Sequence, residues 1–208
     1  MTDLPALITA FTAMFIVIDP IGLAPLFIAM TQGMTTAQRR KIGARACGVA
    51  IGLLLAFAFA GEELLTFIGI SMPAFRIAGG VLLFLTALDM LFERRQARRQ
   101  DNADDAVDPA HDPSIFPLAI PLIAGPGAIA TIILLTGQTD SALGFGAVLG
   151  VMLIVIAMVF VMFMAAGLLE RLLGKTGINV VTRLLGMLLA ALSVQFILDG
   201  LKGFGLAG

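Results

Sequence analysis

The chain has 208 residues, of which 59% are hydrophobic and only 13% are charged, and its formal net charge is −1. Soluble domains are about 45–50% apolar and about 25% charged, so this composition excludes soluble, secreted and disordered classes. The near-neutral charge offers no basic surface for nucleic acid, and the single cysteine, Cys47, excludes an internal disulfide. The sequence therefore predicts an integral membrane protein surrounded by a lipid bilayer.

Six stretches of the chain are apolar for long enough to cross a bilayer as helices. In chain order they are Leu4–Met30, Gly43–Gly61, Met72–Phe92, Ile115–Thr136, Leu143–Leu169 and Ile178–Leu201. Apolar and polar residues do not alternate along these stretches, which argues against a transmembrane β-barrel. We expect an all-α bundle of six transmembrane helices.

A polar segment at 93–114 separates three predicted spans in residues 1–92 from three in residues 115–208. Its first part is basic, and its second part is rich in aspartate around His111, the one histidine of the chain. We interpret this segment as a solvated linker, with a regulatory or metal-binding role as the alternative. A single histidine excludes a histidine-rich metal site.

The basic residues predict the orientation of the chain in the membrane. Most of the 13 Lys and Arg residues follow the first and third spans or lie around the connection between the fifth and sixth. Short loops rich in Lys and Arg stay in the cytoplasm. These loops are therefore predicted to be cytoplasmic, which places both termini outside.

The two halves of the chain share features in the same order. FIVIDPIGLAPLFIAM (15–30) aligns with IPLIAGPGAIATIILL (120–135) when Pro20 is matched with Pro126. The third and sixth spans each carry Arg-x-x-Gly, and the second and fifth each carry Gly-x-x-x-Gly. Since each half holds an odd number of spans, the second must insert upside down. The sequence thus predicts two inverted three-helix repeats, an architecture of transporters; chance sharing of Gly and Pro is the alternative.

Proline and glycine interrupt the first and fourth spans near their middles. Asp19-Pro20 has the form of an N-cap followed by the first residue of a helix, and Gly125-Pro126 has the same form without the carboxylate. Each break is predicted to start a new half-helix near the bilayer midplane, with unpaired amides that attract anions. Irregular backbone at this depth needs protein or a water-filled cavity around it. We therefore expect both half-helix ends to face one cavity.

The predicted binding site combines the residues of the two breaks. Asp19 is a carboxylate near the middle of a span, and such a residue is a functional candidate by default. Amides for a carboxylate and an aspartate for an ammonium group suit a small zwitterion, and a buried Asp19 could also carry a proton. The alternative is that Asp19 only caps its half-helix. The predicted binding residues are Asp19, Pro20, Gly22, Pro25, Gly125, Pro126, Gly127 and Thr131, with Asp89, Ser193 and Gln195 as accessory candidates.

The Gly-x-x-x-Gly pairs, Gly48/Gly52 and Gly146/Gly150, are expected to allow close helix packing. Such packing would occur either within the bundle or between copies in a homo-oligomer.

Four segments of the chain carry a family resemblance. They are DPIGLAPLF (19–27), FRIAGGVLLFLTALDML (75–91), PLIAGPGAIATI (121–132) and TRLLGMLLAALSVQFILDG (182–200). Together they resemble the MarC/SnatA family of bacterial and archaeal inner-membrane proteins, which is grouped with LysE-type exporters. The resemblance covers essentially the whole chain. It implies transport of small neutral amino acids such as glycine and alanine, with proton coupling proposed, and a site at Asp19, Gly22 and Pro25 with Gly125, Pro126 and Gly127.

These observations predict a secondary transporter that exports small neutral amino acids of the glycine, alanine and serine type by alternating access. The alternative is a transporter or channel for a small inorganic ion, which one mid-membrane carboxylate supports poorly. We expect no enzyme, because neither Cys47 nor Ser193 has a catalytic partner at a suitable spacing. No cofactor or metal is expected, and the chain has no G-x-x-x-x-G-K-[ST] motif for ATP.

Overall fold

The computed structural model describes residues 4–92, 94, 113–139 and 141–205, and the elements in these ranges are helices. The predicted linker at 93–114, with His111, lies outside the described residues except at positions 94, 113 and 114. Five spans are long and apolar enough to cross a membrane, and a pair of short helices bent by 55° forms a sixth. The predicted all-α membrane fold is confirmed.

Each predicted span falls on helix, although α3 extends seven residues beyond the predicted second span at each end. In chain order they are α1 (Leu4–Ile18), α2 (Pro20–Met30), α3 (Thr36–Ile68), α4 (Met72–Leu91), η1 (Ser114–Ile123), α6 (Pro126–Thr136), α7 (Ala142–Met164) and α8 (Ala166–Gly203). Four of them begin at an oxygen-bearing side chain that accepts a hydrogen bond from the first turn, namely Asp19, Thr35, Ser71 and Ser141. The first and fourth spans each consist of two pieces, α1 with α2 and η1 with α6.

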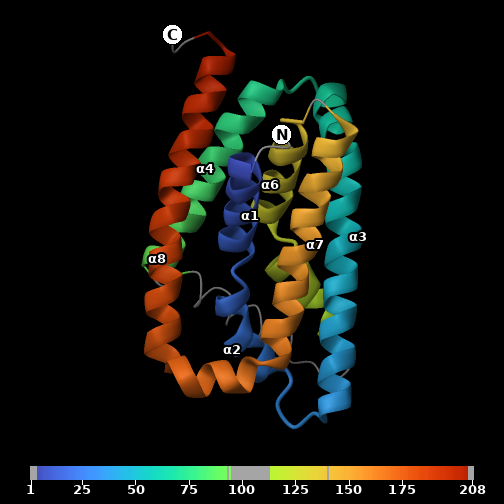
Figure 1. Cartoon of the computed structure of the whole chain (residues 1–208), viewed down its shortest axis with the longest axis vertical. Coiled ribbons are helices and arrows are strands. Elements are labelled where there is room, and N and C mark those ends of the chain that lie inside the picture. Colours follow the sequence, from blue (N-terminus) through green and yellow to red (C-terminus); the bar gives the residue numbers. More distant parts are fainter. Residues whose placement is uncertain (1–3, 93, 95–112, 140, 206–208) are drawn as a thin grey trace.

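The two broken spans occupy the centre of the bundle. In the most apolar stretch of Leu4–Met30, 67% of the residues are buried, against 28–39% in α3, α4, α7 and the last span. Residues 131–136 of α6 are also buried. Figure 1 shows the continuous helices around this centre, with α3 beside α7 and α4 beside α8. The breaks therefore lie where protein, and not lipid, surrounds the irregular backbone.

Helices α4 and α8 pack against each other through small residues. A Cβ atom on Gly80 of α4 would lie 2.8 Å from the carbonyl oxygen of Ser193. A Cβ atom on Gly200 of α8 would lie 2.9 Å from the carbonyl oxygen of Pro73. Glycine at these positions lets the two backbones approach closely.

The Gly-x-x-x-Gly pairs do not pack within the bundle. Apart from the adjacent residues and the nearby backbone of the same helix, no atom of the described residues lies within 4 Å of the Cβ position of Gly48 or Gly52 in α3, or of Gly146 or Gly150 in α7. The first of the two expected roles, packing inside the bundle, is therefore wrong for this chain. The second role, contact between copies, stays a prediction.

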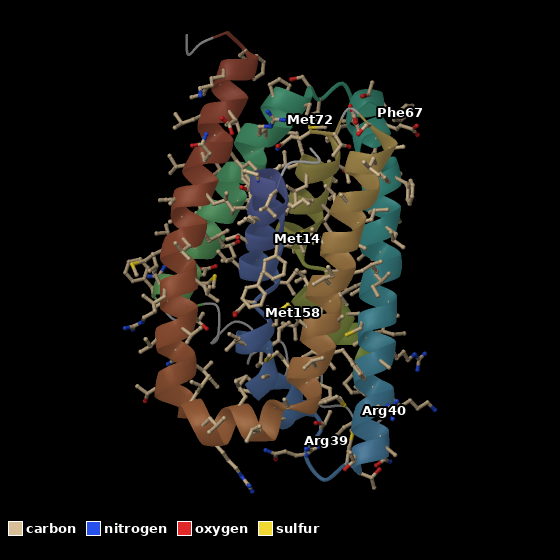
Figure 2. The ribbon with its side chains drawn as sticks, viewed as in Figure 1. Met14, Arg39, Arg40, Phe67, Met72 and Met158 are labelled. Atoms are coloured by element: carbon tan, nitrogen blue, oxygen red, sulfur yellow. The ribbon has the colours of Figure 1, made fainter. Side chains whose placement is uncertain are left out.

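The ends of the helices agree with the topology drawn from the charges. Helix α1 begins and α8 ends at one end of the bundle, and α3 begins at the other end (Figure 1). Figure 2 shows Arg39 and Arg40 at that second end. Arg39 and Arg40 thus lie at the end of the bundle opposite the one where α1 begins and α8 ends. The cytoplasmic location of the basic end stays a prediction.

Two segments differ from a simple bundle of straight spans. Helix α7 ends at Met164, earlier than the predicted Leu169, and the first part of α8 lies across the end of the bundle (Figure 1). Gly174 then turns α8 into the last span with φ 60° and ψ 179°, a conformation that glycine adopts without a steric penalty. In η1, Phe116 and Ile120 have extended backbones because each precedes a proline.

Candidate functional site

The first break is built by Asp19. Its backbone is left-handed, with φ 59° and ψ 66°, between the end of α1 and the start of α2 at Pro20. The carbonyl oxygen of Asp19 accepts a hydrogen bond from the Leu23 amide at 3.1 Å, and its Oδ1 accepts one from the Gly22 amide at 3.0 Å. The predicted helix start at Asp19-Pro20 is present, and Asp19 is its N-cap.

The carboxylate of Asp19 is folded over Gly22. A Cβ atom on Gly22 would collide with Oδ2 of Asp19 and would lie 2.8 Å from its Cγ. Asp19 is 0% exposed, and Gly22 is also buried. Glycine at position 22 is therefore a steric requirement of the buried carboxylate beside it.

The second break is built by Gly125. Its backbone is extended, with φ −81° and ψ 172°, and α6 starts at Pro126. The carbonyl oxygen of Gly125 accepts a hydrogen bond from the Ile129 amide at 3.0 Å, as that of Asp19 does from Leu23. No side chain caps this end of α6. The break has the predicted form, and a Cβ atom on Gly125 would collide with the Pro121 carbonyl oxygen.

The two breaks meet inside the bundle. A Cβ atom on Gly127, in the first turn of α6, would lie 3.1 Å from Cγ1 of Val17, two residues before Asp19. Figure 1 shows both breaks about half-way between the ends of the bundle, with α2 leading toward one end and α6 toward the other. The structure thus places the first turn of α6 against the end of α1, next to the first break, and α2 and α6 run in opposite directions. The repeat of the two halves as a whole stays a prediction.

Two threonines lie beside the second break. Thr131 is buried, and its hydroxyl donates to the carbonyl oxygen of Gly127 at 2.8 Å. Thr86 of α4 brings its Oγ1 to 4.0 Å from the Cβ position of Gly127, while that hydroxyl donates to Leu82 O at 2.9 Å. Sequence reasoning missed Thr86, because nothing in its local pattern marks it as a neighbour of Gly127.

The two breaks differ in how far they are enclosed. Asp19, Pro20 and Gly22 are buried and Pro25 is half-buried. At the second break, Gly125 and Gly127 are half-buried and Pro126 is exposed. The uncapped start of α6 is therefore the more accessible of the two half-helix ends.

The accessory candidates lie in other surroundings. Ser193 belongs to the packed seam between α4 and α8, and its hydroxyl donates to Ala190 O at 2.7 Å. Gln195 is on the exposed face of α8, and its Nε2 donates to Asp199 Oδ1 at 2.8 Å. Asp89 is half-buried near the end of α4. The side-chain hydrogen bonds of Ser193 and Gln195 stay within α8.

Among the residues that the structure describes, no three His, Cys, Asp or Glu side chains come together as a metal site.

Comparison with known proteins identifies the family. A family model described as MarC family integral membrane protein matches residues 4–204. The chain is 37% identical to the UPF0056 membrane protein YhcE of Escherichia coli, over 97% of this chain and 94% of that protein. It is 35% identical to a UPF0056 membrane protein of Methanocaldococcus jannaschii, over 97% and 98%.

A further relative carries a membrane location in its name. The chain is 33% identical to the UPF0056 inner membrane protein YhgN of Escherichia coli, over 94% of this chain and 96% of that protein. No solved structure matches the chain. The matches run through both breaks and all six spans, and the chain belongs to the MarC family of integral membrane proteins.

Proposed function

We propose that the protein is a secondary transporter that exports small neutral amino acids of the glycine, alanine and serine type by alternating access. Membership of an integral membrane family supports a transporter-type role. The observation that carries the proposal is the contact of the α6 start, at Gly127, with Val17 beside the first break in the middle of the bundle. Such paired breaks form the binding sites of transporters built from inverted repeats.

The two half-helix starts would divide the binding of a zwitterion between them. The α6 start lacks a side-chain cap, so its amides and helix dipole can accept the carboxylate of an amino acid. The α2 start already has the carboxylate of Asp19 on the Gly22 amide, which suits a cationic ammonium group instead. The narrow space at Gly127, close to Val17, favours a ligand with a small side chain.

The burial pattern suggests how the site would open. Asp19 is enclosed in this conformation, while the α6 start is partly accessible. For a substrate to reach Asp19, the α1–α2 span must separate from the first turn of α6. We propose that this separation is the movement of one three-helix half against the other. A proton is the proposed coupling ion, and the protein is proposed to lie in the cytoplasmic membrane with both termini outside.

Counterflow in proteoliposomes tests the proposal. Labelled glycine, alanine and serine are offered to vesicles preloaded with the same unlabelled amino acid, and wild type is compared with Asp19→Asn. Asparagine tolerates the left-handed backbone and can cap the helix through its amide oxygen, so this variant removes the charge and keeps the fold. We expect saturable exchange in wild type and its loss in Asp19→Asn.

A second pair of variants tests the α6 start. Gly127→Ala adds a methyl group against Val17, whereas Gly146→Ala adds one in open space. We expect exchange to fall in the first and to be unchanged in the second. Exchange that survives Asp19→Asn would reduce Asp19 to a helix cap. Absence of exchange from folded wild type, together with uptake of a labelled inorganic ion, would replace the proposal by the ion-transport alternative.

A further inference from the structure

Arg76 is an arginine inside the third span whose buried nitrogen has no partner. It is the fifth residue of α4, at the end of the bundle where α4 begins and α8 ends (Figure 1). The side chain is half-buried, and its Nε is buried without a hydrogen-bond partner among the described residues. Buried polar groups are normally hydrogen-bonded, and an arginine within a membrane span is a functional candidate. Arg76 therefore lacks the acceptor that its surroundings require.

The direction of Arg76 follows from the packing of α4. Residues three, four and seven positions apart share one face of a helix. Gly79, three positions after Arg76, packs against α6, and Leu83, seven positions after it, is buried. Val81 and Leu85 are exposed on the opposite face. Arg76 thus lies on the face of α4 that is turned toward the bundle, and a phospholipid headgroup would have to enter the bundle to reach it.

The acidic residue at the same level of α8 does not pair with Arg76. A Cβ atom on Gly200 would lie 3.2 Å from the backbone nitrogen of Ile77, so the residues that precede these two, Asp199 and Arg76, lie at one level. Oδ1 of Asp199 accepts a hydrogen bond from Nε2 of Gln195 at 2.8 Å. Within the described part of the chain, no ion pair joins Arg76 to Asp199 or to another carboxylate. The positive charge of Arg76 is therefore available to an anion from outside the chain.

Arg76 lies between the second break and the end of the bundle where α4 begins. Leu83 brings its Cδ2 to 3.5 Å from the Cβ position of Gly127, in the first turn of α6. Arg76 precedes Leu83 by seven residues, which is about 10 Å along the helix axis. A ligand that moves from the α6 start toward this end of the bundle would come within reach of the Arg76 side chain.

The chemistry of Arg76 suits a carboxylate, because a guanidinium group can donate two parallel N–H bonds to the two oxygens. We propose that Arg76 binds the carboxylate of the transported amino acid between the α6 start and the end of the bundle where α4 begins, which is the outer end in the proposed topology. This assignment rests on the proposed function and adds a second carboxylate site to it. An exported amino acid leaves the α6 amides, pairs with Arg76 and is then released.

A structural role is the alternative for this residue. Helix α6 ends at Thr136, and a Cβ atom on Gly137 would collide with the side chain of Met72, one turn before Arg76. A cation near the C-terminal end of a helix stabilises the helix dipole. Such a role would change the stability of the fold and leave the recognition of the substrate carboxylate unchanged.

The test compares substrate affinity with stability. Counterflow of labelled glycine in proteoliposomes gives KM and the maximal rate, and melting of the purified full chain is followed with a maleimide dye that reacts with the buried Cys47 on unfolding. We expect Arg76→Gln to raise the KM for glycine about tenfold, and to need about tenfold more glycine for the same rise in melting temperature, because charge-assisted hydrogen bonds are lost. Arg76→Lys keeps the charge without the planar fork, so its KM should rise by a smaller factor.

A matched control removes one positive charge at the same end of the bundle. Lys202 is exposed near the end of α8 (Figure 1). Lys202→Gln should keep the KM of wild type. Should Arg76→Gln fail to fold, Arg76→Lys replaces it, and a KM equal to that of wild type in the folded lysine variant would contradict the assignment.

Three results would overturn the proposal. A lower melting temperature of Arg76→Gln with an unchanged KM for glycine would show that Arg76 only stabilises the fold. An equal rise of KM in Lys202→Gln would show general electrostatic attraction of the substrate. Folded wild type that shows neither exchange of glycine, alanine or serine nor stabilisation by them would overturn the proposed function, and the assignment of Arg76 would fall with it.

Discussion

Substitution of Gly22 by alanine tests the contact on which the first break depends. The added Cβ atom would collide with the Asp19 carboxylate, whose Cγ lies 2.8 Å from that position. Because Asp19 is fully buried, its carboxylate cannot move into solvent. We expect it to leave the Gly22 amide, which breaks the 3.0 Å hydrogen bond that caps α2.

The expected size of the effect follows from three contributions. Loss of an N-cap costs about 1 kcal/mol, and a displaced polar group in a buried position costs about 1–3 kcal/mol more. Alanine favours a helix over glycine by about 1 kcal/mol, which offsets part of this. The net destabilisation is about 1–3 kcal/mol, a fall of several degrees in the melting temperature for a chain of this length.

The decisive measurement repeats Gly22→Ala in two backgrounds. Asp19→Gly removes the carboxylate and accepts the left-handed backbone, so Gly22→Ala should there become neutral or stabilising by about 1 kcal/mol. Asp19→Asn retains the shape of the side chain, so Gly22→Ala should there remain destabilising. Melting is followed by maleimide labelling of Cys47, which is 6% exposed. If Gly22→Ala changed the melting temperature in the same direction in wild type, Asp19→Gly and Asp19→Asn, the steric argument would be refuted.

Two further predictions concern packing and orientation. Gly80→Ala would place a methyl group 2.8 Å from the α8 backbone and should lower the melting temperature by several degrees. Gly52→Ala adds a methyl group in open space and should leave the melting temperature unchanged or raise it. Equal effects of the two substitutions would contradict the close packing of α4 against α8. The orientation is tested with single cysteines in a Cys47→Ala background. Glu62→Cys should react with a membrane-impermeant maleimide on intact cells, and Arg40→Cys should react only after the cells are permeabilised. The reverse labelling pattern would place both termini in the cytoplasm.

Local chemistry explains why both breaks could be predicted from the sequence. Proline removes a helix donor and clashes with the preceding turn, and Asp before Pro favours a helix start. The breaks at Asp19 and Gly125 therefore need no tertiary information. The same holds for the spans, since about 20 apolar residues suffice for a crossing helix.

The environment of those breaks could not be predicted in the same way. The sequence allows Asp19 to be a ligand for substrate or a helix cap. The structure shows that its carboxylate caps α2, while a role in binding stays a prediction. Thr86 reaches the second break only because α4 packs against α6. The Gly-x-x-x-Gly pairs, which look like packing motifs, face away from the bundle.

Hydropathy and the backbone limits of proline act over short stretches of chain, so the amino-acid sequence is enough to predict a membrane bundle with interrupted first and fourth spans. Three other features come from helix packing. The first turn of α6 contacts the end of α1 beside the first interruption, Asp19 is enclosed while the start of α6 is partly accessible, and Lys41 and Arg45 line a pocket together with Ser114 of η1. Those features depend on which helix faces pack together, and side-chain fit between distant segments sets that choice.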